Sequence, residues 1–474
     1  MKILLVTGRI AERQVKEIAE RFGCDVYTVD VDVASFITPK HLEHLDLSSY
    51  DLVLVPGLTS KCNWRLLEEK KGVKIRLGPI HAYDIPLVLK NINRIELSHT
   101  VPACRLLSEF KREETLKLIE ESDMGIFRIG DVKIGGTMKI VAEIVNLNEM
   151  SDDELIRRIE YYIESGADII DLGIPAEFDL DDIRRKIKIA RDNCGALSID
   201  TFDKRVIEIG IDIGVDMVMS LSYQNLNCLD VIDRDVAVVV VERDVQRLLD
   251  LVEKVKNKVE KVVADPLLTF DLVNSIIRYS EFRKIDKETP LLFGIGNITE
   301  QIDADSIGVN AILAYIAEEI GCQLLFTTEA SDKTRGCIRE LKIASYMARA
   351  SRLRKSPPKD LGLDLLVLKE KRRIREKRKI SNPIIAKRSK VFERDPRGHF
   401  RIWISDEGIV CEHRDATIVG KDAKSIVDTV ISLGLVSRLD HSAYLGMELK
   451  KAEMALKLGK NYVQDEELKF GIYN

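Results

Sequence analysis

The sequence has no long hydrophobic run. None of its apolar stretches approaches the roughly 18 to 20 residues that a membrane-spanning helix needs. The first residues, MKILLVTG, turn polar too early for a signal peptide and are typical of a first strand. No membrane partner is therefore expected, and the sequence favours a cytoplasmic protein.

Paired cysteines and nucleotide-binding glycine motifs are missing as well. The eight cysteines are scattered without a CxxC pair, so the spacing indicates neither a zinc site nor a disulfide framework. Neither GxGxxG nor GxxxxGK[ST] occurs, which leaves no ground for a dinucleotide or P-loop site. The net charge of -5 gives no argument for a nucleic-acid partner, and none is expected. With 45% hydrophobic residues in a chain of 474, we expect a globular protein of about three domains.

What the sequence does have is a repeated alternation of short apolar strands with helical stretches in its central part. Such an alternation is typical of a parallel sheet with both faces covered. Eight units in one stretch of chain predict a closed (β/α)8 TIM barrel. The predicted strands are 139–146, 167–173, 196–201, 215–220, 237–241, 261–265, 290–297 and 323–329.

Polar side chains follow most of these strands at the end where a barrel carries its active site. For any one of them, capping of the next helix is an equally good explanation. For Asp200, Asp265 and Asn297 together we favour a functional role. The full set of such residues is Asn146, Asp171, Asp200, Ser220, Asp265, Asn297 and Glu329.

Smaller domains flank the predicted barrel. Four strand-like stretches alternate with helices before residue 123 and predict an open-sheet α/β domain, with Gly8 and Gly57 at strand ends where a ligand could approach. Residues 127–135 predict a hairpin that plugs the bottom of the barrel. The expected division is 1–123 for the open sheet, 124–356 for the barrel, 357–398 for a basic linker and 399–474 for a small α+β C-terminal module.

The basic run at 369–379 has two interpretations, a solvated linker helix, which we favour, and a binder of phosphates or nucleic acid. In the C-terminal module, 400–405 and 408–413 predict a hairpin, and 425–433 and 442–458 predict helices. Asp440 next to His441 is better explained by helix capping than by acid–base chemistry.

The central region resembles the pterin-binding barrels, the dihydropteroate synthases and the methyltetrahydrofolate-type methyltransferases. ESGADIIDLG at 164–173 is similar to their second strand. SIDT at 198–201 and Ala-Asp-Pro at 264–266 resemble the third and sixth strands, whose aspartates hold the pterin, which implies this role for Asp200 and Asp265. IVN at 144–146 resembles the synthase asparagine near the leaving diphosphate, so the resemblance implies a Mg²⁺ site at Asn146. Chemically, a carboxylate can accept two parallel N–H bonds from one pterin edge.

Other stretches depart from the synthase pattern. After the fourth strand the synthases carry an asparagine-aspartate pair, and here Ser220 would have to substitute. After the seventh strand, GIGN at 294–297 resembles the methyltransferases, whose asparagine lies near N5 of the pterin. The synthase arginine-x-histidine is absent, and Lys333 or Arg335 would bind a phosphate instead. Asn297 and Lys333 are thus the candidate catalytic residues, and surface ion pairing is the alternative for Lys333 and Arg335.

The whole arrangement resembles an archaeal group of dihydropteroate-synthase-related proteins, expected to act in or near folate-like tetrahydromethanopterin biosynthesis. Three hypotheses follow from the resemblance. The favoured one is a transferase that joins a dihydropterin methyl diphosphate to an arylamine. The second is a methyltransferase that moves a methyl group from N5 of a reduced pterin to a corrinoid or thiol, and the third a pterin-binding protein without turnover. The pterin would be substrate or bound cofactor, and a homodimer is expected.

Overall fold

The structure is a computed structural model that describes residues 1–371, 382–387 and 393–473. The chain divides into two compact units, Met1–Lys369 and Glu370–Asn474. The division falls inside the expected basic linker, and the finer domain boundaries stay a prediction. Most of the basic run at 369–379 lies outside the described residues.

The first unit begins with a four-stranded parallel sheet in the order β2-β1-β3-β4. Its helices lie on both faces, because α1 and α3 pack on one apolar cluster and α2, through Trp64, packs on the other. The predicted open α/β sheet is therefore present. Its strands are β1 (Ile3–Gly8), β2 (Asp25–Val29), β3 (Leu52–Val55) and β4 (Lys74–Leu77), and its helices are α1 (Glu12–Phe22), α2 (Trp64–Lys71) and α3 (Ile85–Lys90).

The two glycines at the ends of these strands have a structural explanation. A Cβ at Gly8 would lie 2.9 Å from the carbonyl oxygen of Val31, and one at Gly57 would lie 2.7 Å from that of Gly78. At both positions the glycine is needed because another backbone segment of the same chain comes close. The two glycines therefore do not indicate a ligand site.

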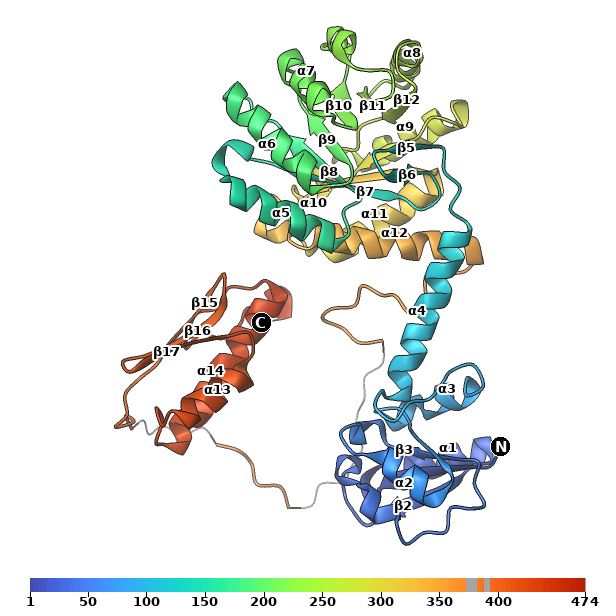
Figure 1. Cartoon of the computed structure of the whole chain (residues 1–474), viewed down its shortest axis with the longest axis vertical. Coiled ribbons are helices and arrows are strands. Elements are labelled where there is room, and N and C mark those ends of the chain that lie inside the picture. Colours follow the sequence, from blue (N-terminus) through green and yellow to red (C-terminus); the bar gives the residue numbers. More distant parts are fainter. Residues whose placement is uncertain (372–381, 388–392, 474) are drawn as a thin grey trace. The chain divides into compact units, whose positions relative to one another are not determined.

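The centre of the first unit is the expected barrel, built from an eight-stranded parallel sheet in the order β12-β11-β10-β9-β8-β7-β14-β13. A parallel bridge between Ala264 and Leu291 joins its two ends. All eight predicted strands are present, and Figure 1 labels β7 to β12. They are β7 (Lys139–Ile144), β8 (Ile169–Gly173), β9 (Leu197–Asp200), β10 (Met217–Leu221), β11 (Ala237–Val241), β12 (Lys261–Asp265), β13 (Leu292–Gly294) and β14 (Leu324–Thr328).

Helices surround these strands, and local signals set their ends. Ser151 caps the first of them with a capping box to Glu154, and Gly166, in a left-handed conformation, ends it. After β10 a 3-10 segment, Leu226–Val231, takes the place of a helix. The helices are α5 (Asp152–Ser165), α6 (Leu180–Asn193), α7 (Lys204–Ile213), α8 (Val245–Lys256), α9 (Leu272–Ile285), α10 (Gly296–Thr299), α11 (Ser306–Ile320) and α12 (Cys337–Arg354).

The hairpin β5 (Phe127–Ile129) and β6 (Val132–Ile134) closes the bottom of the barrel, as predicted. Ile129 and Ile134 belong to the same buried cluster as Val141, Ile169 and the other interior residues of the strands. Helix α4 (Ala103–Glu121) precedes the hairpin and packs on α12.

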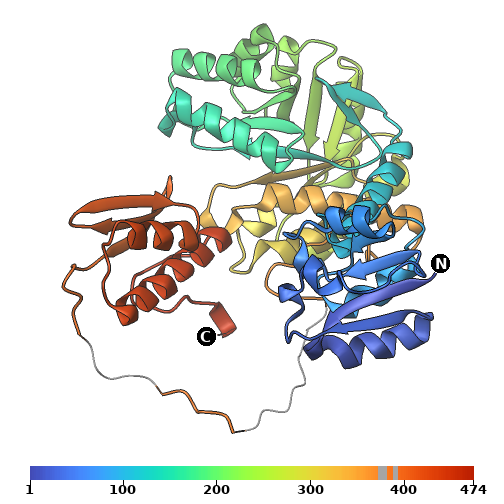
Figure 2. The same ribbon diagram turned by 60° about the horizontal axis from the view of Figure 1, so that its bottom comes forward.

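The second unit is an antiparallel three-stranded sheet with two helices on one face (Figure 2). Ile402 and Cys411 of the sheet pack against Ile426 and Leu449 of the helices. The predicted hairpin and helices are present, and the third strand is an addition. The elements are β15 (Arg401–Ser405), β16 (Gly408–His413), β17 (Ala416–Gly420), α13 (Ala423–Ser432) and α14 (Leu439–Leu458).

No helix within the described ranges combines the length and apolar character needed to cross a membrane.

Candidate functional site

The candidate site is the carboxyl-terminal mouth of the barrel. Along each strand, alternate residues point inward, and the deeper inward positions, such as Val141, Ile169 and Val263, form an apolar cluster. Two residues further along each of these strands, the inward position holds a carboxylate. Glu143, Asp171 and Asp265 occupy those positions, and Asp200 ends β9 in the same way.

Three of these acids lie together. Glu143, Asp171 and Asp200 each offer one carboxylate oxygen, and the three oxygens lie within 4.8 Å of one another. The strand register causes this, because Glu143 is paired with Asp171 and Gly173 is paired with Asp200 on adjacent strands. The mouth therefore concentrates negative charge on neighbouring strands.

Asp171 is the most deeply buried member of this group. It has 0% of its surface exposed, and neither of its carboxylate oxygens has a hydrogen-bond partner. The hydroxyl of Ser198, which is paired with Asp171 in the register, is also buried without a partner. Buried polar atoms normally have partners, so this position differs from an ordinary core position.

The pKa values of the three acids are raised. Burial raises the pKa of Glu143 to about 7, helped by the negative charges of Asp200 and Glu300. Burial, with Asp200 and Glu143 nearby, raises the pKa of Asp171 well above its ordinary value, although the hydroxyl of Ser198 opposes this shift. Burial also raises the pKa of Asp200, and the backbone N–H of Ser220 opposes that shift. The group therefore favours protons or a cation.

Asp265 stands on β12 and is held in place by two donors. The hydroxyl of Tyr279 donates to its Oδ1 at 2.6 Å, and the backbone N–H of Leu267 donates at 2.8 Å. Burial raises its pKa to about 6, although these two hydrogen bonds and Arg278 lower it. With 7% of its surface exposed, Asp265 is slightly more accessible than Asp171.

Asn297 reaches the same mouth from the short helix α10. Its Nδ2 donates to the carbonyl oxygen of Leu268 at 3.1 Å, which ties it to the loop after Asp265. A Cβ at Gly294, an inward position of β13, would lie 2.9 Å from Nδ2 of Asn297. The glycine thus leaves the space that the amide occupies.

Ser220 lies at the mouth through its backbone. Its N–H bonds to Asp200, and its carbonyl oxygen accepts from Nδ2 of Asn225 at 3.1 Å. The peptide bond from Met219 to Ser220 is cis. Asn225 also accepts from the backbone N–H of Ser222 at 2.8 Å, so this buried amide fixes the loop.

The remaining predicted residues lie at the rim or have structural partners. Lys333 is exposed and forms an ion pair with Asp303 at 3.1 Å, which is the surface ion pairing given above as the alternative for this residue. Its positive charge also lowers the pKa of Glu300, which burial raises. Arg335 is exposed as well. Glu329 accepts from the backbone N–H of Ile338 at 3.1 Å and from Tyr161 at 2.9 Å, so it orients the start of α12.

Asn146 follows β7 in a left-handed conformation, with a φ of 58° and an exposed side chain that makes no capping bond. Its exposed amide is therefore available to a ligand, but the structure does not test the metal role predicted for it. The functional roles expected of all these residues stay predictions.

Sequence reasoning missed several residues of the mouth. Glu143 could have been recognised from the sequence, since a carboxylate inside an otherwise apolar strand costs free energy unless it is paired or binds a ligand. Ser198 and Tyr279 could not have been, because a serine in a strand and a tyrosine in a helix are ordinary. Their position depends on the register and on packing, which one sequence does not specify.

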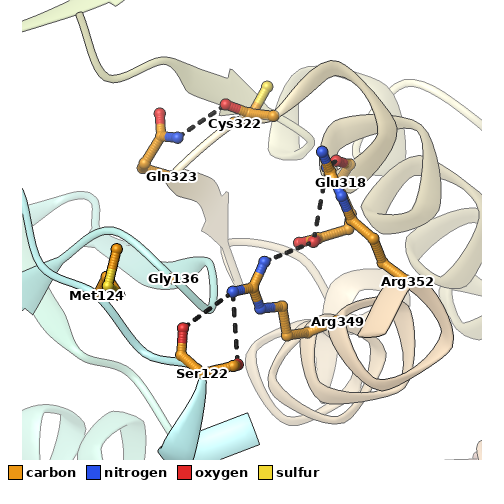
Figure 3. A pocket seen from close by; sticks show the side chains of 9 residues that line it. Ser122, Met124, Gly136, Glu318, Cys322, Gln323, Arg349 and Arg352 are labelled. Carbon is orange, nitrogen blue, oxygen red and sulfur yellow. Dashed lines mark hydrogen bonds and ion pairs between the residues drawn. The ribbon is translucent and has the colours of Figure 1, made fainter. Parts of the chain in front are cut away.

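A separate pocket of about 290 Å³ lies at the opposite end of the barrel (Figure 3). Gly136 and Gln323, which line it, precede β7 and β14. Arg349 is paired there with Glu318 at 3.4 Å and donates to the carbonyl oxygen of Ser122 at 3.2 Å. None of the predicted site residues lines this pocket.

Known proteins match this chain in part and over its whole length. A family model described as PterinBD-DUF4346 matches residues 394–465, in the C-terminal unit. Uncharacterized protein MJ0107 of Methanocaldococcus jannaschii is 38% identical over 521 aligned positions, which cover 99% of each chain.

Solved dihydropteroate synthases are among the structures that match. The 7,8-dihydropteroate synthase of Vibrio fischeri ES114 is 18% identical, with 47% of this chain and 95% of that chain covered and a TM-score of 0.37. The synthase of Thermus thermophilus in complex with 6HMPPP is 17% identical, with 46% and 95% covered and a TM-score of 0.38.

The predicted TIM barrel is present, and the C-terminal unit matches a family model that is described by its association with pterin-binding domains. The chain belongs to the same family as the Methanocaldococcus jannaschii protein.

Proposed function

We propose that the barrel mouth binds a reduced pterin and that the protein is a dihydropteroate-synthase-like transferase. The observation that carries the proposal is the placement of two carboxylates, Asp200 and Asp265, on β9 and β12 at the same mouth. They are the two acids for which the sequence resemblance implies contacts with a pterin. The names of the matching synthases agree with this class of ligand.

The chemistry of a pterin suits these two acids. One edge of the ring carries an exocyclic amine beside a ring N–H, and a carboxylate can accept both bonds at once. Tyr279 and Leu267 already fix one oxygen of Asp265, so the carboxylate is oriented before a ligand arrives. Asn297, beside the same loop, can donate to or accept from another edge of the ring.

In the proposed reaction, the arylamine nitrogen forms a bond to the methylene carbon of the dihydropterin, and the bond from that carbon to the diphosphate breaks. The amine loses one proton, and the diphosphate leaves. Lys333 and Arg335, exposed at the rim, are the residues proposed to contact phosphate groups. Asn297 and Lys333 remain the proposed catalytic residues, and Asp171 and Ser220 complete the proposed binding set.

A Mg²⁺ ion would neutralise the leaving diphosphate in this reaction. Asn146 offers one exposed amide oxygen at the end of β7, which is a suitable ligand type for Mg²⁺. The proposed cellular setting is cytoplasmic synthesis of a folate-like or tetrahydromethanopterin carrier, by a homodimer.

The acidity of the mouth favours one alternative. A diphosphate would enter next to Glu143, Asp171, Asp200 and Asp265, all of which carry acidic side chains. Methyl transfer from N5 of a reduced pterin to a corrinoid or thiol needs no anionic group at this position. Asn297 would then lie near N5, as the methyltransferase-like GIGN stretch implies. A pterin-binding protein without turnover is the third candidate.

Turnover distinguishes these candidates. Purified protein would be mixed with the 6-hydroxymethyl dihydropterin diphosphate and 4-aminobenzoate, with and without Mg²⁺, and released diphosphate would be measured. Diphosphate release that requires the arylamine supports the synthase. Binding of an N5-methylated pterin with methyl loss to a cob(I)alamin acceptor, and no diphosphate release, replaces it with the methyltransferase. Pterin binding with neither reaction leaves the protein without turnover.

A further inference from the structure

The carboxylate group on β7, β8 and β9 is an electrostatic problem in the protein alone. Three acids from neighbouring strands bring oxygens within 4.8 Å of one another in a largely buried place. Like charges at such a distance repel strongly where water is excluded. An ordinary protein core would relieve the repulsion with an arginine, a lysine or a set of N–H donors.

The structure shows no such relief at Asp171. In the described parts of the chain, neither oxygen of Asp171 accepts a hydrogen bond of normal geometry, and the group that lies beside its carboxylate is the neutral hydroxyl of Ser198, not a cation. The nearest comparison is Asp265, at the same mouth, whose carboxylate receives two donors. The two aspartates therefore differ in their hydrogen bonding, since the fold provides donors for the carboxylate of Asp265 but not for that of Asp171.

A second buried polar atom points to the same place. The hydroxyl of Ser198 makes no hydrogen bond of normal geometry, has 0% of its surface exposed and stands opposite Asp171 across the β8–β9 pairing. The inward direction of Ser198 follows from its position between the interior residue Ala196 and the inward carboxylate of Asp200. An additional oxygen is thus available beside the acids, directly or through water.

We propose that Glu143, Asp171 and Asp200 bind one hard divalent cation, of the Mg²⁺ or Mn²⁺ type. The cation supplies the positive charge that the surrounding fold lacks. The cation bonds to one oxygen from each acid. Water and the hydroxyl oxygen of Ser198, bound directly or through water, complete the coordination.

The donor set selects the kind of metal. All three donors are carboxylate oxygens, which suit Mg²⁺, Mn²⁺ and Ca²⁺, and soft metals would need thiolate or imidazole ligands. In an octahedral Mg²⁺ site the ligand oxygens are about 3 to 4 Å apart. Small rotations of the side chains bring the three oxygens from their present spacing to that value.

The site does not depend on the proposed function, because it is formed by the chain alone. It bears on that function nonetheless. A cation beside Asp200 offsets the negative charge of the mouth and so removes the main objection to a diphosphate substrate there.

The test is a titration of the full-length, chelator-treated protein with Mn²⁺ and no pterin, followed by electron paramagnetic resonance and calorimetry. We expect one Mn²⁺ per chain, displaced by Mg²⁺. Asp171→Asn should weaken Mn²⁺ binding at least tenfold. Glu242→Gln is the matched control, because Glu242 follows β11 at the same end of the barrel but pairs with Arg247 at 3.2 Å. Its affinity should equal that of the wild type.

Thermal unfolding gives a second readout and guards against misfolding. Without metal, Asp171→Asn should melt at the same temperature as the wild type or higher, because it replaces a buried acid that lies beside two other acids with a neutral side chain of the same shape. With Mn²⁺, the wild type should gain stability and the variant should not. If Asp171→Asn does not fold, Glu143→Gln serves in the same two measurements. No Mn²⁺ binding at millimolar concentration, or equal binding by both acid variants and the wild type, overturns the proposal. Pterin binding, measured separately, tests the proposed function whether or not Mn²⁺ binds.

Discussion

Asp265 is the residue whose chemistry at the mouth can be followed most simply with pH. It must be ionised to accept two N–H bonds, and burial raises its pKa to about 6 in the free protein. The charged and titratable groups around it are Asp200, which raises this pKa, and Arg278 and Tyr279, which lower it. Because a bound donor pair favours the ionised form, ligand binding and proton binding compete.

We therefore predict that pterin affinity is nearly constant from pH 7 to 8 and falls below about pH 6, by up to about tenfold per pH unit. Calorimetric titrations between pH 5 and 8 measure this. Asp265→Asn should bind the pterin more weakly at every pH. Its affinity should vary with pH only to the extent that the ionisation of Asp200 requires. An affinity that is flat or rises as the pH falls would contradict the assignment.

At the scale of elements, the hairpin β5–β6 shows how a short segment closes the barrel. Gly130 at its turn has a φ of 54°, and a Cβ there would lie 2.6 Å from the carbonyl oxygen of Gly195. The turn needs glycine twice over, once for its conformation and once for the close approach of the two backbones.

Gly130→Ala should accordingly lower the free energy of unfolding by about 1 to 3 kcal/mol. Gly214→Ala is a suitable comparison, because Gly214 also has a positive φ of 93° but has nothing within 4 Å of its Cβ position. It should cost only the conformational part, about 1 kcal/mol. Chemical denaturation of both variants measures the difference, and equal losses would show that the hairpin does not fit tightly.

The elements also show what the sequence could and could not predict. The eight barrel strands were predictable because each is a short apolar run between helical stretches. The loss of a helix after β10 and the third strand of the C-terminal sheet were missed, since neither breaks a local pattern. In the site, Asp200 and Asp265 were found because they end their strands. Glu143 lies inside its strand, and only the pairing with Asp171 reveals its neighbours.

At the scale of the whole molecule, the C-terminal unit has its own core and its own buried polar centre. Asp395 accepts from the hydroxyl of Ser437 at 2.6 Å and from the backbone N–H groups of Ser437, Arg438 and Arg397 at 2.9 Å each. His441 Nδ1 lies 3.2 Å from the same carboxylate. Burial alone would raise the pKa of Asp395, but the hydrogen bonds outweigh it and hold this pKa far below its ordinary value. The carboxylate therefore stabilises the unit above about pH 4, and this contribution is lost only in strong acid.

Asp395→Ala should destabilise the C-terminal unit by about 3 kcal/mol, because several buried donors lose their acceptor. Differential scanning calorimetry of the full-length protein should show a lower transition for this unit and an unchanged one for the barrel. Asp415→Ala, an exposed acid of the same unit, is the control and should leave both transitions in place. A single transition shifted as a whole would mean that the two units unfold together.

The central claim is that the barrel mouth holds a reduced pterin between Asp200 and Asp265. Its most direct test is calorimetric titration of the wild type, Asp200→Asn and Asp265→Asn with a reduced pterin and with its 6-hydroxymethyl diphosphate, each with and without Mg²⁺. We predict one site per chain in the wild type and at least tenfold weaker binding in each variant, with a larger gain from Mg²⁺ for the diphosphate than for the pterin alone. Absence of binding to both compounds, or equal binding by the wild type and both variants, would contradict the account.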